Sequence, residues 1–104
     1  MGFFFYRLDP PRPTFAKDMT AAEAGLMKRH ADYWASLVAS GKAIAFGPVQ
    51  DARGSYGIGI LQLEAGEDPR QIAQGDPALI SGLGFTCRIQ RMPHVIHAGQ
   101  LQPH

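Results

Sequence analysis

The amino-acid sequence predicts an α+β fold in which the elements follow the order β-α-β-β-α-β. Short apolar runs lie at the beginning and the end of the domain, as expected of strands. A long amphipathic stretch follows the first run, and residues typical of the start of a second, shorter helix precede the last run. The chain has 104 residues, of which 45% are hydrophobic and 18% are charged. That size and balance are typical of one packed globular domain and not of a disordered chain.

The first strand and the first helix carry the clearest local signals. Residues 3–8 form an aromatic run that the proline-rich stretch 9–13 ends, so a strand is expected there. Thr20 and Glu23 have the spacing of a capping box, in which each side chain accepts a hydrogen bond from an unpaired amide at a helix start. An amphipathic helix then runs to Gly41, which caps it, because apolar side chains recur at three- and four-residue steps: Met27, His30, Ala31, Trp34, Leu37 and Val38.

The rest of the chain supplies two strands joined as a hairpin, a short helix and a last strand. The hairpin strands are expected at residues 42–46, which Gly47-Pro48 ends, and at 56–64. The helix is expected from Asp68 or Pro69 to about 75–77, and the last strand at 85–92. This order is that of a ferredoxin-like split β-α-β arrangement, an antiparallel four-stranded sheet with both helices on one face.

Both faces of the predicted sheet are apolar. Phe3, Phe5 and Arg7 alternate with Phe4, Tyr6 and Leu8, and Ile58 and Ile60 lie opposite Leu61 and Leu63. An antiparallel sheet with one face in water shows regular alternation of apolar and polar residues, so the second face of this sheet needs a cover. A chain of this length has no third layer to spare, and we expect a two-fold homodimer of the dimeric α+β barrel kind.

The charge and cysteine content of the chain indicate which partners and which compartment to expect. Ten Lys and Arg against nine Asp and Glu leave a formal charge of +1, and the basic residues form no run that would follow a nucleic acid backbone. The apolar N-terminal run is too short for a signal peptide, so neither export nor membrane insertion is expected. The single Cys87 excludes an internal disulfide. We therefore expect a cytoplasmic protein without a nucleic acid or membrane partner.

His30 and Asp76 are the strongest candidates for chemistry. His30 lies on the apolar stripe of the predicted helix, as either a packed core histidine or a general base. Asp76 precedes Pro77 after the second helix, where an Asp is commonly a turn former or a helix cap. Because both helices lie on one face of the predicted sheet, His30 and Asp76 can come close enough to form a hydrogen-bonded pair beside a cavity.

Several short motifs form a combination that is more specific than any one of them. They are Arg7-Leu-Asp-Pro-Pro-Arg-Pro13, His30-Ala-Asp-Tyr-Trp34, Gly41-Lys42, Phe46-Gly-Pro-Val49, Tyr56-Gly-Ile-Gly-Ile60, Asp76-Pro77 and Gly82-Leu83. Together with the aromatic first strand, they resemble the YCII-related (YciI-like) family, small dimeric members of the α+β barrel superfamily, over roughly residues 3 to 93.

The resemblance implies an active site built on a His and an Asp, which match His30 and Asp76. It implies no substrate, although a relative of similar fold acts as a dehydrochlorinase on a chlorinated hydroxyquinol. We expect the YCII-related domain at residues 1–93 and a C-terminal tail at 94–104, which the family pattern does not cover.

Four further side chains are assigned to substrate binding: Arg7, Phe15, Tyr33 and Trp34. Arg7 would bind an anionic group, although an Arg at a strand end is commonly a solvated rim residue. Tyr33 would donate a proton, or pack as an amphipathic aromatic. Phe15 belongs to the proline-rich loop 10–18, which we expect to border the pocket mouth because long connections in small domains are often functional.

No metal and no cofactor are expected. His94, His97 and His104 lie in a tail broken by Pro and Gly, where their spacing gives no fixed ligand geometry. The glycines of the 56–60 run lie within a strand, so they are not a dinucleotide fingerprint; they permit close packing or leave room for a ligand. Cys87 is expected to be a small buried hydrophobe and not a nucleophile.

The sequence is compatible with two main classes of function and with a third, weaker one. The first is a cofactor-independent lyase or isomerase in which His30 removes a proton and Asp76 holds the imidazole. The second is a non-catalytic module in which the same pocket binds or senses a small metabolite, aromatic or anionic. The third is a haem site with His30 as axial ligand, since related dimeric barrels include haem-binding members, although no spacing in the sequence requires iron.

Overall fold

The computed structural model of the chain describes residues 1–101 and contains a four-stranded antiparallel sheet with the order β2-β3-β1-β4. The strands are β1 (Gly2–Asp9), β2 (Ala43–Val49), β3 (Tyr56–Leu63) and β4 (Thr86–Met92). β1 lies in the middle of the sheet, paired with β3 on one side and with β4 on the other. The predicted α+β fold with a ferredoxin-like strand order is confirmed.

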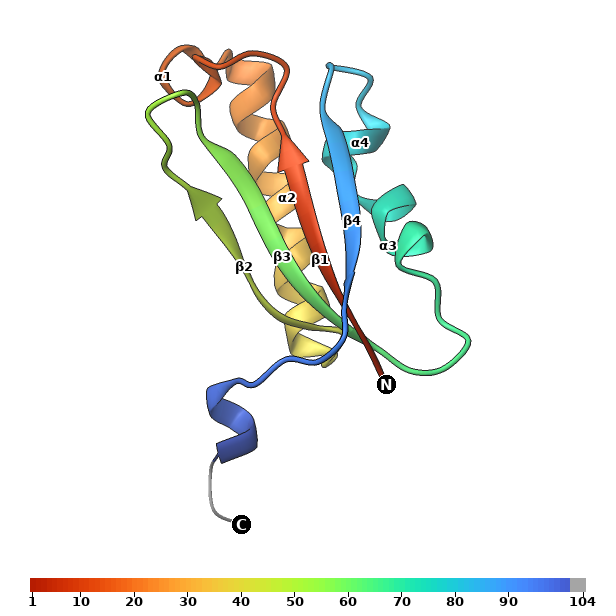
Figure 1. Cartoon of the computed structure of the whole chain (residues 1–104). Helices are drawn as coiled ribbons and strands as arrows, with labels where there is room; N and C mark the ends of the chain where they lie inside the picture. Colours follow the sequence, from red (N-terminus) through yellow and green to blue (C-terminus); the bar gives the residue numbers. More distant parts are fainter. Residues whose placement is uncertain (102–104) are drawn as a thin grey trace.

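Three of the helices lie on one face of this sheet, as Figure 1 shows. They are α2 (Ala21–Ala39), α3 (Pro69–Gly75) and α4 (Pro77–Ile80), with a single turn α1 (Phe15–Asp18) before α2 and a 3-10 turn at Ala98–Leu101. The predicted capping box is present, since the Thr20 hydroxyl accepts from the Glu23 amide and the Glu23 carboxylate accepts from the Thr20 amide. Gly41 follows α2 with φ +79, a conformation that glycine adopts without strain.

The structure differs from the predicted elements in two details. β2 does not stop at Gly47-Pro48 but continues to Val49, because β2 is an edge strand, where a proline without an amide hydrogen is tolerated. The turns α1 and α4 were not predicted, since four residues are too few to show helical periodicity. The predicted tail includes residues 102–104, with His104, which lie outside the described residues.

The core forms between α2 and the sheet. Its largest fully buried side chains are Trp34, Tyr6, Leu26, Leu61, Leu63 and Asp76. Trp34 lies over β3 at Gly59, where a Cβ atom would come within 2.4 Å of the Trp34 ring. One glycine of the 56–60 run therefore permits the close packing that the sequence suggested.

We expect Gly59→Ala to destabilise the domain by about 1–3 kcal/mol, because the added methyl group must push Trp34 out of a filled core. Urea unfolding measures the effect. Gly47→Ala is the matched control, since a Cβ atom at Gly47 meets nothing within 4 Å and its φ is not positive. Equal stability of the two variants would show that the Trp34 ring is not fixed against β3.

The opposite face of the sheet is free of helices (Figure 1). Phe3, Phe5 and Ile60 lie on it, half-buried, because they alternate along their strands with the buried residues Tyr6 and Leu61. Within residues 1–101, no helix combines the length and the apolar character that crossing a bilayer requires.

Candidate functional site

A fully buried carboxylate lies at the junction of α3 and α4. Asp76 is 0% exposed, and its side chain caps α4 by accepting a hydrogen bond from the Ala78 amide at 2.9 Å. The same carboxylate accepts from the Tyr6 hydroxyl of β1 and from the Trp34 indole N–H of α2, both at 3.0 Å. Asp76 is therefore a helix cap, as its position before Pro77 suggested, and also the centre of a buried polar network.

The fourth partner of Asp76 is His30 of α2. Its Nδ1 lies 2.8 Å from Oδ1 and 3.0 Å from Oδ2. His30 was predicted from the inward stripe of a capped helix, and Asp76 from the end of the neighbouring helix. The two residues are 46 positions apart in the sequence and are in direct contact in the structure.

The network keeps Asp76 ionised. Burial alone would raise the pKa of this carboxyl, but the hydrogen bonds from His30, Trp34 and Ala78 outweigh it, and the pKa lies below its usual value. Burial, with the neighbouring carboxylate, raises the pKa of Tyr6 far above its usual value, so the phenol stays protonated and donates. An ionised carboxylate only accepts hydrogen bonds, and His30 Nδ1 must therefore carry the proton in this contact.

A cavity of about 330 Å³ opens beside His30, between the first half of α2, α1 and the edge of β2 and β3. Its lining is Leu8, Pro10, Phe15, Ala16, Met19, Met27, His30, Ala31, Phe46, Gly47, Pro48, Ser55, Tyr56, Gly57, Ile58 and Phe85. With Nδ1 committed to Asp76, the nitrogen that His30 has left for a ligand in this cavity is Nε2. The arrangement can take a proton from a bound molecule, or give one to it.

A comparison with known families matches the model of the YCII-related domain to residues 3–93. The chain belongs to the YCII-related family. Comparison with curated proteins gave no match. The resemblance that the sequence motifs suggested is confirmed, with the same boundaries.

The site residues expected for this YCII-related protein do not all lie together. His30 and Asp76 are in direct contact, and Phe15 lines the cavity. Trp34 does not line the cavity but is buried in the core, where its indole N–H donates to Asp76. The Tyr33 hydroxyl donates to the Ile72 carbonyl at 2.7 Å and so joins α2 to α3.

Arg7 lies on a second, polar cavity of about 430 Å³ at the end of the sheet. Its guanidinium carbon is 3.7 Å from the centroid of the Tyr56 ring, and its Nε donates to Asp9 at 3.0 Å. Tyr56, Pro10 and Ser55 border both cavities. Arg7 thus lines the polar cavity and not the cavity beside His30.

Sequence reasoning missed Tyr6 as a member of the site. Tyr6 is 1% exposed, and it is the only residue with a hydroxyl among the helix-facing residues Phe4, Tyr6 and Leu8 of β1. A buried phenol normally requires a hydrogen-bond partner, so this hydroxyl was the signal that pointed to a buried acceptor above β1.

Two remaining candidates are also placed by the structure. Cys87 is half-buried, and this burial raises the pKa of its thiol, which disfavours the nucleophilic thiolate. Within the 56–60 run, Gly59 admits Trp34, and Gly57 lines the cavity. Among residues 1–101, no three His, Cys, Asp or Glu side chains gather in a way that could hold a metal ion.

Proposed function

We propose that this YCII-related protein is a cofactor-independent lyase or isomerase in which His30 is the general base and Asp76 is its partner. The observation that carries the proposal is that His30, which lines an apolar cavity, contacts the fully buried Asp76 carboxylate through Nδ1. A carboxylate on one ring nitrogen fixes the tautomer and stabilises the imidazolium that forms when the other nitrogen takes a proton.

The proposed step starts with a bound carbon acid whose C–H hydrogen lies against Nε2. That hydrogen passes to Nε2 as a proton, and its bonding electrons stay with the substrate. In a lyase they form a double bond to the neighbouring carbon, whose leaving group departs with its own bonding electrons. In an isomerase they shift the double bond, and His30 returns the proton to a different carbon.

The lining of the cavity favours a small neutral substrate. Of the side chains that line it, only His30, Ser55 and Tyr56 are polar, and the described lining contains no Lys, Arg, Asp or Glu. An anionic group would lose its hydration there without gaining a charge partner. We therefore propose a neutral molecule the size of one substituted ring, in contact with Phe15, and not the anionic ligand that Arg7 suggested.

The experiment is a comparison of wild type with His30→Gln against a panel of neutral single-ring compounds that carry an acidic hydrogen next to a leaving group. Isothermal titration measures binding, and NMR of the compounds measures turnover. Loss of turnover with most binding retained supports the enzyme. Binding without turnover in wild type would instead favour the second candidate, a module that senses a small apolar metabolite.

We further propose that the open face of the sheet is covered by a second copy of the chain. The support is the half-buried apolar set Phe3, Phe5 and Ile60, on a face that no helix covers. A face of this kind is complementary to itself across a two-fold axis. With Cys87 as its single cysteine, the protein is also suited to a reducing compartment such as the cytoplasm.

The dimer is tested by Phe5→Arg, which places a charge from each copy in the proposed interface. Wild type is expected to sediment as a dimer at micromolar concentration, and Phe5→Arg as a monomer. Val38→Arg is the control, because Val38 is an exposed apolar residue on α2, away from the open face, and it should remain a dimer. A wild type that is a stable, folded monomer under these conditions would rule the proposed dimer out.

A further inference from the structure

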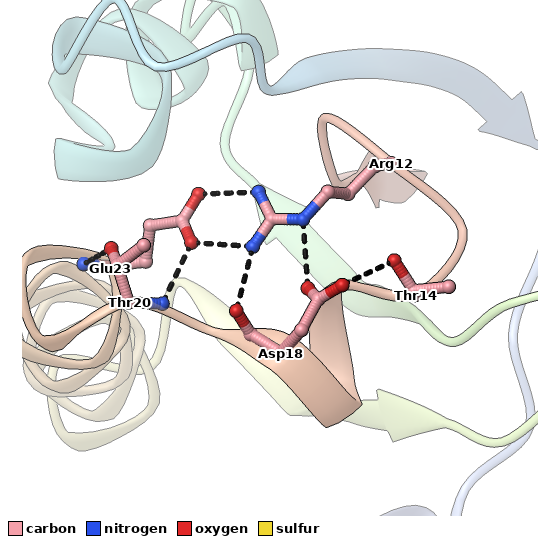
Figure 2. Close-up of polar contacts among 5 residues, drawn as sticks. All are labelled: Arg12, Thr14, Asp18, Thr20 and Glu23. Carbon is pink, nitrogen blue, oxygen red and sulfur yellow. Dashed lines mark hydrogen bonds and ion pairs between the residues drawn. The ribbon is translucent and has the colours of Figure 1, made fainter.

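Arg12 is bound on all three of its guanidinium nitrogens (Figure 2). Its Nη1 and Nη2 donate to the two carboxylate oxygens of Glu23, at 2.8 and 2.7 Å. Its Nε donates to the Asp18 carboxylate at 2.7 Å, and Nη2 donates also to the Asp18 carbonyl at 3.1 Å. Arg12 thus joins the end of α1 to the start of α2.

The partners of Arg12 are themselves held in place. Asp18 also accepts from the Thr14 hydroxyl at 2.6 Å, and Glu23 closes the capping box of α2 with Thr20. Glu23 is 7% exposed, and the hydrogen bond from Arg12, with that from the Thr20 amide, lowers its pKa to about 2. The carboxylate therefore stays charged through the neutral range, and the pair is a bidentate one of the strong kind.

The residues on both sides of Arg12 are fixed by other contacts. Pro11 packs against Gly84, and Pro13 packs against Gly54, so closely that a Cβ atom on either glycine would lie within about 3 Å of the proline. Both glycines have a positive φ. Arg12 therefore reaches from a rigid part of the loop to the two carboxylates.

The segment that follows forms one wall of the cavity beside His30. We call residues 14–19 the cover; within it Phe15, Ala16 and Met19 line the cavity. Phe15 also packs edge-on against Phe85, with ring centroids 5.2 Å apart. Arg12 itself does not line this cavity, and its effect on a ligand there must pass through the cover.

We propose that Arg12 is a positioning residue that holds the cover against the cavity, so that the affinity of the site for its ligand depends on the contacts of Arg12 with Glu23 and Asp18. The inference rests on the proposed function in that the cavity is taken as the ligand site. When the Arg12 contacts open, the cover loses its attachment to α2, and the wall of the cavity that carries Phe15 and Met19 loosens.

Two variants remove the contacts in different ways. Arg12→Gln removes the guanidinium. Glu23→Gln keeps an oxygen to accept from the Thr20 amide, and so keeps the capping box, but places an amide N–H against Arg12 Nη1. Arg70→Gln is the matched control, since Arg70 forms an exposed ion pair with Asp68 at the start of α3, away from the cover.

Hydrogen exchange measured by NMR reports the cover directly. The amides of Lys17 and Asp18 both donate to the Thr14 carbonyl, and we expect them to exchange at least about tenfold faster in both variants. The Ala78 amide, which donates to Asp76, should keep its rate, because the His30–Asp76 network does not involve Arg12. A purely stabilising role would instead raise all the slow rates together.

Phenol is the probe for the cavity, because it is neutral, has one ring and can donate its hydroxyl hydrogen to Nε2. We expect both variants to bind phenol about tenfold more weakly than wild type and Arg70→Gln. Unchanged exchange in the cover would overturn the proposal, and so would faster exchange with unchanged affinity. If phenol binds neither wild type nor variants, the proposed function fails, while the exchange rates still decide whether Arg12 holds the cover.

Discussion

Replacing Asp76 with alanine is expected to lower the free energy of unfolding by about 3–5 kcal/mol. The substitution leaves four donors without their acceptor: the Tyr6 hydroxyl, the Trp34 N–H, the Ala78 amide and His30 Nδ1. At least the first three are in buried contacts, where each unsatisfied donor costs about 1–3 kcal/mol. Urea unfolding at neutral pH measures the loss.

Asp32→Ala is the control for this effect. Asp32 is an exposed carboxylate on α2, and removing it should change stability by no more than about 0.5 kcal/mol. If the two variants unfolded at the same urea concentration, the network around Asp76 would contribute nothing to the fold.

The stabilisation by Asp76 should depend on pH with a definite sign. Its pKa is lowered in the folded protein, so the ionised carboxylate stabilises the fold above the pKa of the unfolded chain. This stabilisation is lost as the pH falls through the lower pKa of the folded state. The difference between wild type and Asp76→Ala should therefore shrink as the pH is lowered from about 5 to about 2.

His30→Gln is expected to reduce turnover by about 10²- to 10⁴-fold, because that is the usual contribution of a general base. Asp76→Asn should also reduce turnover, because all four hydrogen-bond partners of the carboxylate are donors. The amide nitrogen of Asn would face either the Ala78 or the Trp34 N–H, which it cannot accept from. The double variant should be no slower than His30→Gln, because Asp76 acts through His30. Steady-state rates with the substrate found in the panel measure all three.

Met27→Leu is the control for these rates. Met27 lines the same cavity near His30 but has no proton to transfer, and a change of similar volume should leave turnover within a small factor. Multiplied losses in the double variant would mean that His30 and Asp76 work independently, which contradicts their assignment as a pair.

The sequence predicted the fold well where short-range chemistry decides the structure. Thr20 and Glu23 fixed the start of α2 because a capping box is a local arrangement, and the alternation of Phe3, Phe5 and Ile60 with buried neighbours showed a sheet with two apolar faces. Pro48 misled because whether a proline ends a strand depends on whether the strand lies at the edge of the sheet. That is a property of topology and not of local sequence.

The site was predicted only in part, for the same reason. The stripe of α2 and the position before Pro77 suggested His30 and Asp76, but the shared donors Tyr6 and Trp34 come from β1 and α2 and depend on how these elements pack. Arg12 was not predicted as a site residue, because its two carboxylate partners lie 6 and 11 residues away and the turn α1 brings them together.

The most direct test of the central claim is the nitrogen NMR spectrum of the His30 ring at mildly alkaline pH, recorded with and without phenol. The structure predicts a hydrogen on Nδ1, held by Asp76, and a bare Nε2 whose signal moves when phenol donates its hydroxyl hydrogen. A hydrogen on Nε2 in the free protein, or an Nε2 signal that stays in place while phenol binds, would contradict the assignment of His30 as the base.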